Sequence, residues 1–308
     1  MRLVTRGDLD GLACAVIITS HEQIDEIALI HPQDITDKKV EILKTDILSN
    51  LPYHPNCAKW FDHHLQTENN PKPPARFDGA YGLAPSAAGL VYEYYGGAAK
   101  MPQFEELVRQ TDRLDSARLT RDDIERPEGH ILLGYTVDGR SGFGAFQDYF
   151  MLLVDLLKRQ PIEKVLQHPE VKKRSDRLRS EDAAFREALR SHSREEDNVV
   201  ITDFRNLESV PVGNRFLVYA LFPEASVSVR LHWAPGRRSV MAAVAHSILN
   251  RTCVTNIGKL LSRYGGGGHR GAGTAPLPLH NAEAAIEEII AHLKREAQVH
   301  AATTSRRP

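Results

Sequence analysis

The chain has 308 residues, of which 42% are hydrophobic and 26% are charged, and its formal net charge is -1. This length is enough for two domains, and the composition is that of an ordinary globular protein. The near-neutral charge argues against binding to long nucleic acid duplexes through bulk electrostatics. It leaves room for a short, locally basic groove that holds a few phosphates.

The cysteines and the first residues of the chain indicate the cellular compartment of the protein. The cysteines are few, widely spaced and without a CxxC pair, which disfavours a disulfide framework or a zinc knuckle and fits a reducing cytoplasm. The first residues lack the charged and then long apolar segments of a signal peptide. No apolar run reaches the roughly 18 residues that span a bilayer. We therefore expect a cytoplasmic protein. The cysteines are Cys14, Cys57 and Cys253.

The first third of the chain alternates short apolar runs with helix-like stretches. Strands alternating with helices predict a parallel sheet in an α/β layer. We expect strands at residues 3–5, 26–30, 40–43 and 58–61, and the start of a helix at residues 12–19. Acidic residues follow several of these strands. Because sites in open α/β sheets form at the carboxyl ends of strands, we expect these residues to share one site. They are Asp8, Asp10, Asp46 and Asp62.

Helices dominate the middle of the chain, and strands return after it. The highly charged stretch 170–194 predicts a solvated helix that joins two domains. We expect a polar tail at 299–308 to be disordered. The predicted domains are 1–165 and 196–298, with a helical linker at 166–195. Further helices are predicted at 86–95, 104–115, 255–264 and 282–297, and strands at 198–202, 216–222, 226–232 and 239–244.

The first motif with chemical content is Asp8-Leu9-Asp10-Gly11. Two carboxylates separated by one residue, on a turn between a strand and a helix, can face one metal site. Divalent cations such as Mg²⁺ and Mn²⁺ prefer such oxygens. Gly11 would relieve the tight turn. Acidic turn residues and helix N-caps are also common, so the motif alone supports both interpretations equally.

The triplet Asp62-His63-His64 follows the apolar pair Trp60-Phe61. On an extended segment the first and third side chains face one way and the second faces the other, so a turn is needed for all three to serve one site. One imidazole can bind a metal while the other approaches a substrate. The alternative is a surface cluster in which Asp62 caps a turn.

Three other acids are candidate ligands. Asp46 could bridge two metals, although lone aspartates in loops are usually turn formers. Asp112 and Asp115 lie close together, and one could be a ligand while the other caps the helix or pairs with Arg113. The sequence leaves that choice open.

Four consecutive glycines precede His269 and Arg270. Glycines expose backbone N–H groups that can form an anion-binding nest, and they let a phosphate approach the chain closely. Arg230, on an expected strand, could add a donor. The alternative is a flexible interdomain loop. The glycines are Gly265, Gly266, Gly267 and Gly268.

The order of these motifs resembles that of the DHH/DHHA1 phosphoesterase superfamily. Its members include RecJ-like exonucleases, oligoribonuclease and cyclic-dinucleotide phosphodiesterases, and exopolyphosphatase-like proteins. The resemblance extends from residue 1 to about residue 295. It implies a two-domain α/β protein, with an N-terminal parallel-sheet DHH domain and a smaller C-terminal α/β DHHA1-like domain. It also implies an active site in the cleft between the domains.

The resemblance further implies a cofactor and residue roles. The cofactor is Mn²⁺, as one or two ions, with Mg²⁺ or Co²⁺ as alternatives. Asp62 and His64 are implied as catalytic, substrate-facing residues, and Arg230, Gly266, Gly267, Gly268, His269 and Arg270 as substrate-binding residues. The implied metal ligands are Asp8, Asp10, Asp46, His63 and one of Asp112 and Asp115.

One departure from the family pattern concerns the residues before Asp8. Several branches place a metal-binding histidine there, whereas this chain has Val4 and Arg6. Arginine stays protonated and is no ordinary metal ligand. Arg6 is instead a candidate catalytic residue, which would bind a substrate phosphate through two N–H groups and neutralise the developing charge. A single-metal or attenuated enzyme is one outcome.

The function implied is metal-dependent hydrolysis of short nucleotide-containing phosphodiesters, such as nanoRNA or a cyclic or linear dinucleotide, or of phosphoanhydrides such as polyphosphate. The alternative is a catalytically attenuated protein of the same fold that binds nucleotides or oligonucleotides. The expected partner is a small phosphorylated substrate or a short single-stranded oligonucleotide. No membrane partner is expected, and a homodimer is left open.

Overall fold

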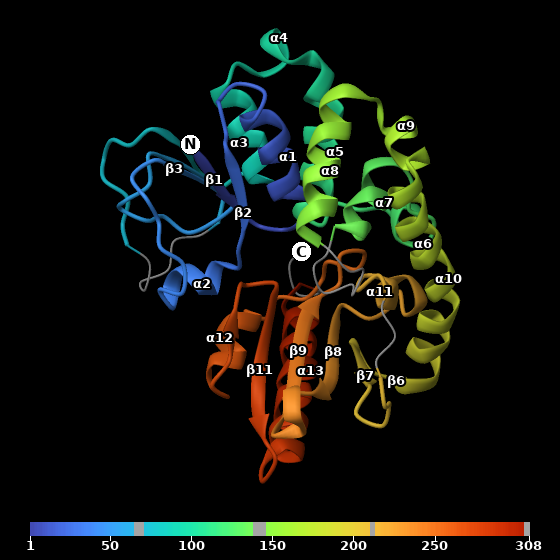
Figure 1. The fold of residues 1–308 in the computed structure, drawn as a ribbon. Helices are drawn as coiled ribbons and strands as arrows, with labels where there is room; N and C mark the ends of the chain where they lie inside the picture. The colour runs from blue at the N-terminus through green and yellow to red at the C-terminus, as the bar shows by residue number, and fades with distance from the viewer. Residues whose placement is uncertain (65–70, 138–145, 210–212, 305–308) are drawn as a thin grey trace. The chain divides into compact units, whose positions relative to one another are not determined.

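The computed structural model describes residues 1–64, 71–137, 146–209 and 213–304. The chain forms two compact units (Figure 1). The first comprises Met1–Arg118 and Pro127–Leu178, and the second comprises Leu119–Arg126 and Arg179–Pro308. Helix α10 (Pro169–His192) carries the chain from the first unit into the second. The passage therefore falls inside the segment predicted as a helical linker.

The first unit is built on a five-stranded sheet in the order β2-β1-β3-β4-β5, in which all neighbouring strands are parallel. The sequence prediction of a parallel α/β sheet is confirmed. The inner strands contain consecutive buried apolar residues, as expected where both faces of a sheet are covered. The strands are β1 (Arg2–Thr5), β2 (Glu26–Leu29), β3 (Asp46–Ser49), β4 (Lys59–Asp62) and β5 (Gly79–Tyr81).

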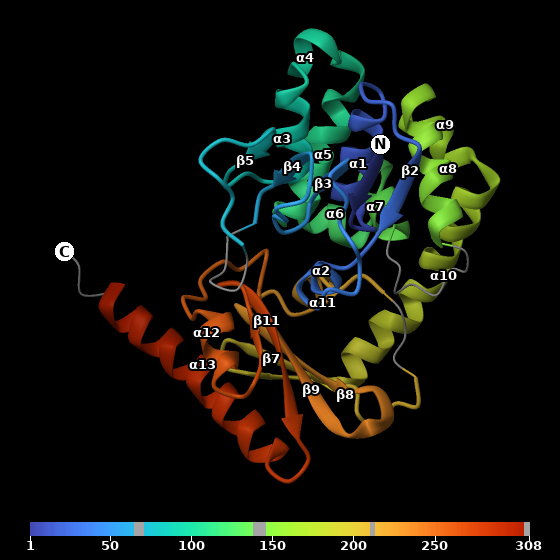
Figure 2. The same ribbon diagram turned by 60° about the vertical axis from the view of Figure 1, so that its left-hand side comes forward.

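Helix α1 (Leu9–Ile18) is the centre of the core on one side of this sheet. Every residue of α1 is buried, and apart from Asp10 its side chains are apolar or absent all round, so the helix is not amphipathic. It contacts α3 (Ala87–Tyr94), α5 (Glu105–Asp115) and α8 (Phe146–Arg159), as Figures 1 and 2 show. The remaining helices of the unit are α2 (Pro32–Thr36), α4 (Gly97–Lys100), α7 (Gly129–Thr136) and α9 (Ile162–Gln167), with the 3-10 turn η1 (Pro102–Phe104).

The third strand does not lie where the sequence predicted it. Residues 40–43 are irregular, and the strand begins at Asp46. The carboxylate of Asp46 accepts a hydrogen bond of 2.8 Å from the backbone N–H of Leu43, which closes a turn just before the strand. Ile47 and Leu48 are fully buried and pair with the first strand and the fourth strand, so they provide the apolar run of the true strand.

The second unit is a six-stranded mixed sheet in the order β10-β11-β9-β8-β7-β6, in which β7 and β8 are the parallel pair. Helices α12 (Ile257–Ser262) and α13 (Ala282–Thr304) pack against it around a separate apolar core. The strands are β6 (Ser193–Glu196), β7 (Val199–Asp203), β8 (Val227–Trp233), β9 (Ser239–His246), β10 (Gly267–Gly268) and β11 (Ala272–Pro278); the helices α6 (Arg121–Glu125) and α11 (Leu217–Leu221) and the turn η3 (Pro235–Arg237) complete the unit.

Two predictions for this unit need correction. Residues 216–222 were predicted as a strand, but Leu217–Leu221 form helix α11. Four consecutive residues, 217–220, are buried, which favours a helix enclosed by other elements over a strand with one exposed face. Helix α13 continues to Thr304, so residues 299–304 of the predicted disordered tail are helical. Residues 305–308 lie outside the described part of the chain.

The longest helices, α10 and α13, both carry charged residues along their length. Among the residues that the structure describes, no helix is long and apolar enough to cross a membrane. The predicted cytoplasmic location stays a prediction.

Candidate metal centre

The turn from β1 into α1 positions Asp10 in the first turn of that helix. A Cβ atom at Gly11 would lie 2.0 Å from the backbone oxygen of Arg6, so only glycine fits this turn. Asp10 is 1% exposed, and its two carboxylate oxygens accept hydrogen bonds of 3.0 and 2.8 Å from the backbone N–H groups of Ala87 and Ala88. These N–H groups begin α3, and a helix N-terminus stabilises negative charge.

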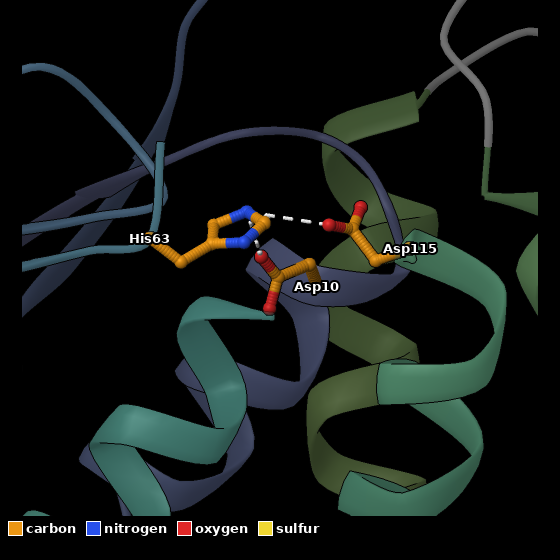
Figure 3. Close-up of side chains that lie close together, drawn as sticks. All are labelled: Asp10, His63 and Asp115. Carbon is orange, nitrogen blue, oxygen red and sulfur yellow. Dashed lines mark ion pairs between the residues drawn. The ribbon is translucent and has the colours of Figure 1, made fainter. Parts of the chain in front are cut away.

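His63 follows β4 directly and turns its ring toward Asp10 and Asp115 (Figure 3). Its Nδ1 lies 3.0 Å from the backbone oxygen of Ala84. A carbonyl oxygen only accepts, so Nδ1 carries a proton, and Nε2 is the nitrogen that can offer a lone pair to a metal. Nε2 is buried and, in the part of the chain that the structure describes, has no hydrogen-bond partner; it lies 3.2 Å from Asp115 Oδ2 and 3.6 Å from Asp10 Oδ2.

The side chains of Asp10, His63 and Asp115, hereafter the triad, can each offer one ligand atom, and these atoms lie within 4.8 Å of one another. Nε2 faces two carboxylates, an arrangement that suits either a proton on the ring or a cation between the three groups. One imidazole nitrogen with two carboxylate oxygens suits a borderline divalent cation such as Mn²⁺. The buried Nε2 and the two carboxylates are therefore a donor set that fits a metal ion.

Burial and neighbouring charge act on both carboxylates of the triad. Burial raises the pKa of Asp10 well above the usual range of an aspartate, and the negative charges of Asp115 and Asp8 raise it further. Burial also raises the pKa of Asp115, although the nearby His63 opposes the rise. A divalent cation would relieve this accumulation of negative charge.

The other two members of the Asp62-His63-His64 triplet form a pair of their own. Asp62 is 1% exposed, and its Oδ1 lies 2.8 Å from Nδ1 of His64. This contact places the proton of His64 on Nδ1 and holds the ring. The rings of His63 and His64 lie 4.2 Å apart between centroids, so the pair is next to the triad.

Asp8 was predicted as a ligand, but it is not in the triad. It caps α1: its Oδ1 accepts from the backbone N–H of Gly11 at 2.9 Å and from Nδ2 of Asn50 at 3.1 Å. Its Oδ2 lies 3.2 Å from Nε of Arg6. The sequence left two interpretations of Asp8 open, a helix cap and a residue of a metal site. In the structure Asp8 is a helix cap and also lies near the metal-binding groups.

The structure does not bring Asp46 to the triad. Asp46 is the first residue of β3 and lies in register with Arg2 at the start of β1, whereas Asp10 and His63 follow the carboxyl ends of their strands. It is fully buried and forms an ion pair with Arg2 at 2.6 Å. Asn50, which directly follows β3, occupies the end of that strand nearest Asp8.

Asp112 and Asp115 have separate positions on α5. Asp115, the last residue of the helix, reaches the triad. Asp112 accepts a hydrogen bond of 2.6 Å from the hydroxyl of Ser86, and burial raises the pKa of Asp112. Ser86 is the N-cap of α3. The structure thus brings Asp115, and not Asp112, to the candidate metal centre.

Three residues that sequence reasoning missed support this centre, namely Asn50, Ala84 and Ser86. Ser86 could have been found, because a serine before an apolar helical run is a typical N-cap. Asn50 was hidden by the misplaced third strand. The contact of Ala84 with His63 joins residues 21 apart in the chain and leaves no pattern in the sequence.

The glycine segment of the second unit is held by its own hydrogen bonds. The backbone N–H groups of Gly265, Gly266 and His269 donate to Ser262, Leu261 and Ala272. Gly267 and Gly268 pair with β11 as strand β10. The N–H groups that an anion-binding nest would need are thus largely engaged. Substrate binding by this region stays a prediction from the sequence. The residues concerned are Gly266, Gly267, Gly268, His269, Arg270 and Arg230.

No protein-family model and no curated protein matches the chain. Among solved structures it is similar to the pGpG-specific phosphodiesterase PggH from Vibrio cholerae, with 36% identity and a TM-score of 0.83 over 96% of this chain and 99% of that one. An exopolyphosphatase-related protein from Bacteroides fragilis matches at 13% identity and a TM-score of 0.56 over 97% and 93% of the two chains. RecJ from Thermus thermophilus, in complex with Mn²⁺, matches at 12% identity and 0.57 over 96% and 52%.

The two weaker matches show the fold, and the match to PggH shows the family. The sequence prediction, which rested on the DxDG turn, the DHH triplet and the distant glycines, is confirmed. The chain belongs to the DHH/DHHA1 phosphoesterase superfamily.

Proposed function

We propose that the protein is a metal-dependent phosphodiesterase that hydrolyses pGpG to two molecules of GMP. The similarity to PggH over nearly the whole of both chains carries this proposal. Hydrolysis of the one internal phosphodiester of a linear dinucleotide adds one water and releases two nucleoside monophosphates. The arrangement of Asp10, His63 and Asp115 supports the proposal, because it provides a cation site beside a histidine that is held by an aspartate.

The proposed cofactor is Mn²⁺, with Mg²⁺ and Co²⁺ as competitors for the same ligands. The triad would hold the cation. When bound, the cation supplies Lewis acidity and lowers the pKa of a water molecule so that it can attack phosphorus near neutral pH. The backbone N–H groups that hold Asp10 and the carbonyl that holds Nδ1 of His63 keep both ligands oriented.

His64 is the proposed proton carrier. Its Nδ1 donates to Asp62, so Nε2 is the ring nitrogen that exchanges a proton with the substrate or the leaving oxygen. Asp62 is buried and holds the ring in one tautomer. Since the side chain of His64 is 31% exposed, it can reach a bound substrate without a rearrangement of the core.

The test measures GMP release from pGpG by the purified protein with Mn²⁺, beside pApA, a cyclic dinucleotide and polyphosphate. We expect pGpG to be the best substrate, and His63→Ala to lose both hydrolysis and Mn²⁺ binding. The matched control is Asp46→Asn, because Asp46 lies away from the triad. Efficient cleavage of another substrate with no cleavage of pGpG would contradict the proposed substrate.

The alternative of a nucleotide-binding protein with attenuated catalysis is favoured by one observation. Arg6 contacts Asp8 where several branches of the family carry a metal-binding histidine. Calorimetric binding of pGpG with turnover no faster than that of His63→Ala would support this alternative. Turnover at least a hundredfold above that variant would exclude it.

A further inference from the structure

Asp8 lies beside the triad, and hydrogen-bond donors from three described residues surround its carboxylate. Its oxygens receive a backbone N–H from Gly11, a carboxamide N–H from Asn50 and a guanidinium N–H from Arg6. Asp8 is the N-cap of α1, two residues before Asp10 of the triad. A second cation bound through Asp8 would have to compete with these three donors for the carboxylate oxygens.

The orientation of the Asn50 side chain is fixed by Asp8. A carboxylate accepts only, so the NH₂ group of Asn50 and not its oxygen must face Asp8. This leaves Oδ1 of Asn50 buried and, among the described residues, without a hydrogen-bond partner. A buried amide oxygen with no donor is uncommon, and it points to a group that serves the site rather than the stability of the fold.

The guanidinium of Arg6 is the fixed positive charge in this region. Nε of Arg6 lies 3.2 Å from Asp8 Oδ2, and Arg6 is near enough to Asp115 for its charge to act there. Arginine keeps its proton at any pH of interest, so this charge is permanent. It would repel a cation placed beside Asp8.

We propose that the protein binds a single divalent cation, through Asp10, His63 and Asp115, and that Arg6 together with Asn50 occupies the place of a second one. Arg6 then supplies, as a fixed charge, part of the positive potential that the phosphate of a substrate requires. Asn50 is a positioning residue, which keeps Asp8 turned toward Arg6. The proposal rests on the proposed function only in assigning a divalent cation to the triad.

One pair of substitutions should convert the site. Asn50→Asp replaces the NH₂ group that faces Asp8 with an oxygen, and two facing carboxylates bind a cation. The backbone of Asn50 has a φ of 56°, a conformation that aspartate tolerates nearly as well as asparagine. Arg6→Ala removes the competing charge. The double variant should therefore bind two ions.

The experiment is calorimetric titration of the metal-free full-length protein with Mn²⁺, checked by elemental analysis of the loaded protein. We expect one ion per chain for the wild type, two for Arg6→Ala/Asn50→Asp, and one for Asp8→Asn with an affinity within about tenfold of wild type. Asparagine keeps the N-cap of α1, so Asp8→Asn is a conservative change. Two ions in the wild type, or none in Asp8→Asn, would overturn the proposal.

The wild-type stoichiometry decides the proposal even if the double variant does not fold. It also separates the two proposals made for this protein. One bound ion with no hydrolysis of pGpG would refute the proposed function and leave the single-cation site intact. Hydrolysis of pGpG with two bound ions would do the reverse.

Discussion

Asp112 accepts a hydrogen bond of 2.6 Å from the hydroxyl of Ser86, the residue that caps helix α3. The first two backbone N–H groups of this helix hold the carboxylate of Asp10. Asp112 therefore acts on the candidate metal centre without touching it, because it positions the helix end that positions a ligand. Outer contacts of this kind commonly affect metal affinity.

Ser86→Ala should weaken Mn²⁺ binding by roughly tenfold and cost about 1 kcal/mol of stability, since it removes both the cap and the partner of Asp112. Ser86→Thr keeps the hydroxyl and is the matched control. Mn²⁺ titration and thermal unfolding of both variants measure the two effects. An unchanged affinity in Ser86→Ala would show that α3 holds Asp10 without its cap.

Asp115→Asn should stabilise the metal-free protein slightly and abolish its stabilisation by Mn²⁺. The raised pKa of Asp10 means that the folded protein binds a proton more tightly than the unfolded chain. Stability therefore falls as pH rises through the folded pKa, and Asp115 enlarges this penalty. We expect a gain of roughly 1 kcal/mol or less near pH 7, and a flatter dependence on pH.

Thermal unfolding of the metal-free wild type and of Asp115→Asn between pH 5 and 8 provides the measurement. The gain should shrink toward acid pH, where Asp10 takes up its proton in both proteins. A variant that is less stable than wild type at every pH would contradict this account of the triad.

His64→Ala should lower the turnover of pGpG by roughly 10²–10⁴-fold and leave Mn²⁺ binding intact, because His64 is proposed to move protons and not to hold the cation. Asp62→Asn should lower turnover as well, since the Nδ1 proton of His64 loses its negatively charged acceptor. Steady-state kinetics with a parallel Mn²⁺ titration separates these effects. Loss of the metal in His64→Ala would move this histidine into the ligand set.

Asp46→Asn should cost about 1–3 kcal/mol of stability while Mn²⁺ stoichiometry and turnover stay at the wild-type level. The substitution breaks a buried ion pair with Arg2 at the amino end of the sheet, far from the ends of the strands that carry the triad. Denaturant unfolding and Mn²⁺ titration test the two halves of this prediction. A reduced metal content would restore Asp46 as a ligand.

Gly266→Ala and Gly267→Ala should differ sharply although the residues are adjacent. A Cβ at Gly266 would lie 2.2 Å from the backbone oxygen of Thr274, whereas a Cβ at Gly267 meets nothing within 4 Å. We expect a loss of about 1–3 kcal/mol for the first and little change for the second. Denaturant unfolding distinguishes them, and equal losses would show that strand β10 is not packed as described.

The sequence predicted the parallel sheet because its apolar runs and helical stretches alternate with little ambiguity. It misplaced the third strand because residues 40–43 are as apolar as residues 46–49. That shift put Asp46 just past a predicted strand end and hid Asn50. The misplaced strand therefore put Asp46 at the carboxyl end of the sheet, whereas the structure has it at the amino end.

The choice between Asp112 and Asp115 could not have been made from the pattern. Residues three apart on a helix share a face, so periodicity treats both acids alike. The structure separates them through Ser86, which engages Asp112, and through His63, which meets Asp115 at the helix end. Both contacts join distant parts of the chain, and neither is encoded locally.

Several glycines of the second unit are required by backbone packing, independently of any ligand. Gly258 of α12 lies against the glycine strand, where a Cβ would come within 2.3 Å of the backbone oxygen of Gly268. The amides at the start of α12 are also taken up by the carbonyls of His269 and Arg270. Packing therefore requires glycine at 258, 266 and 268 whatever ligand the protein binds, whereas Gly267 is not constrained in this way.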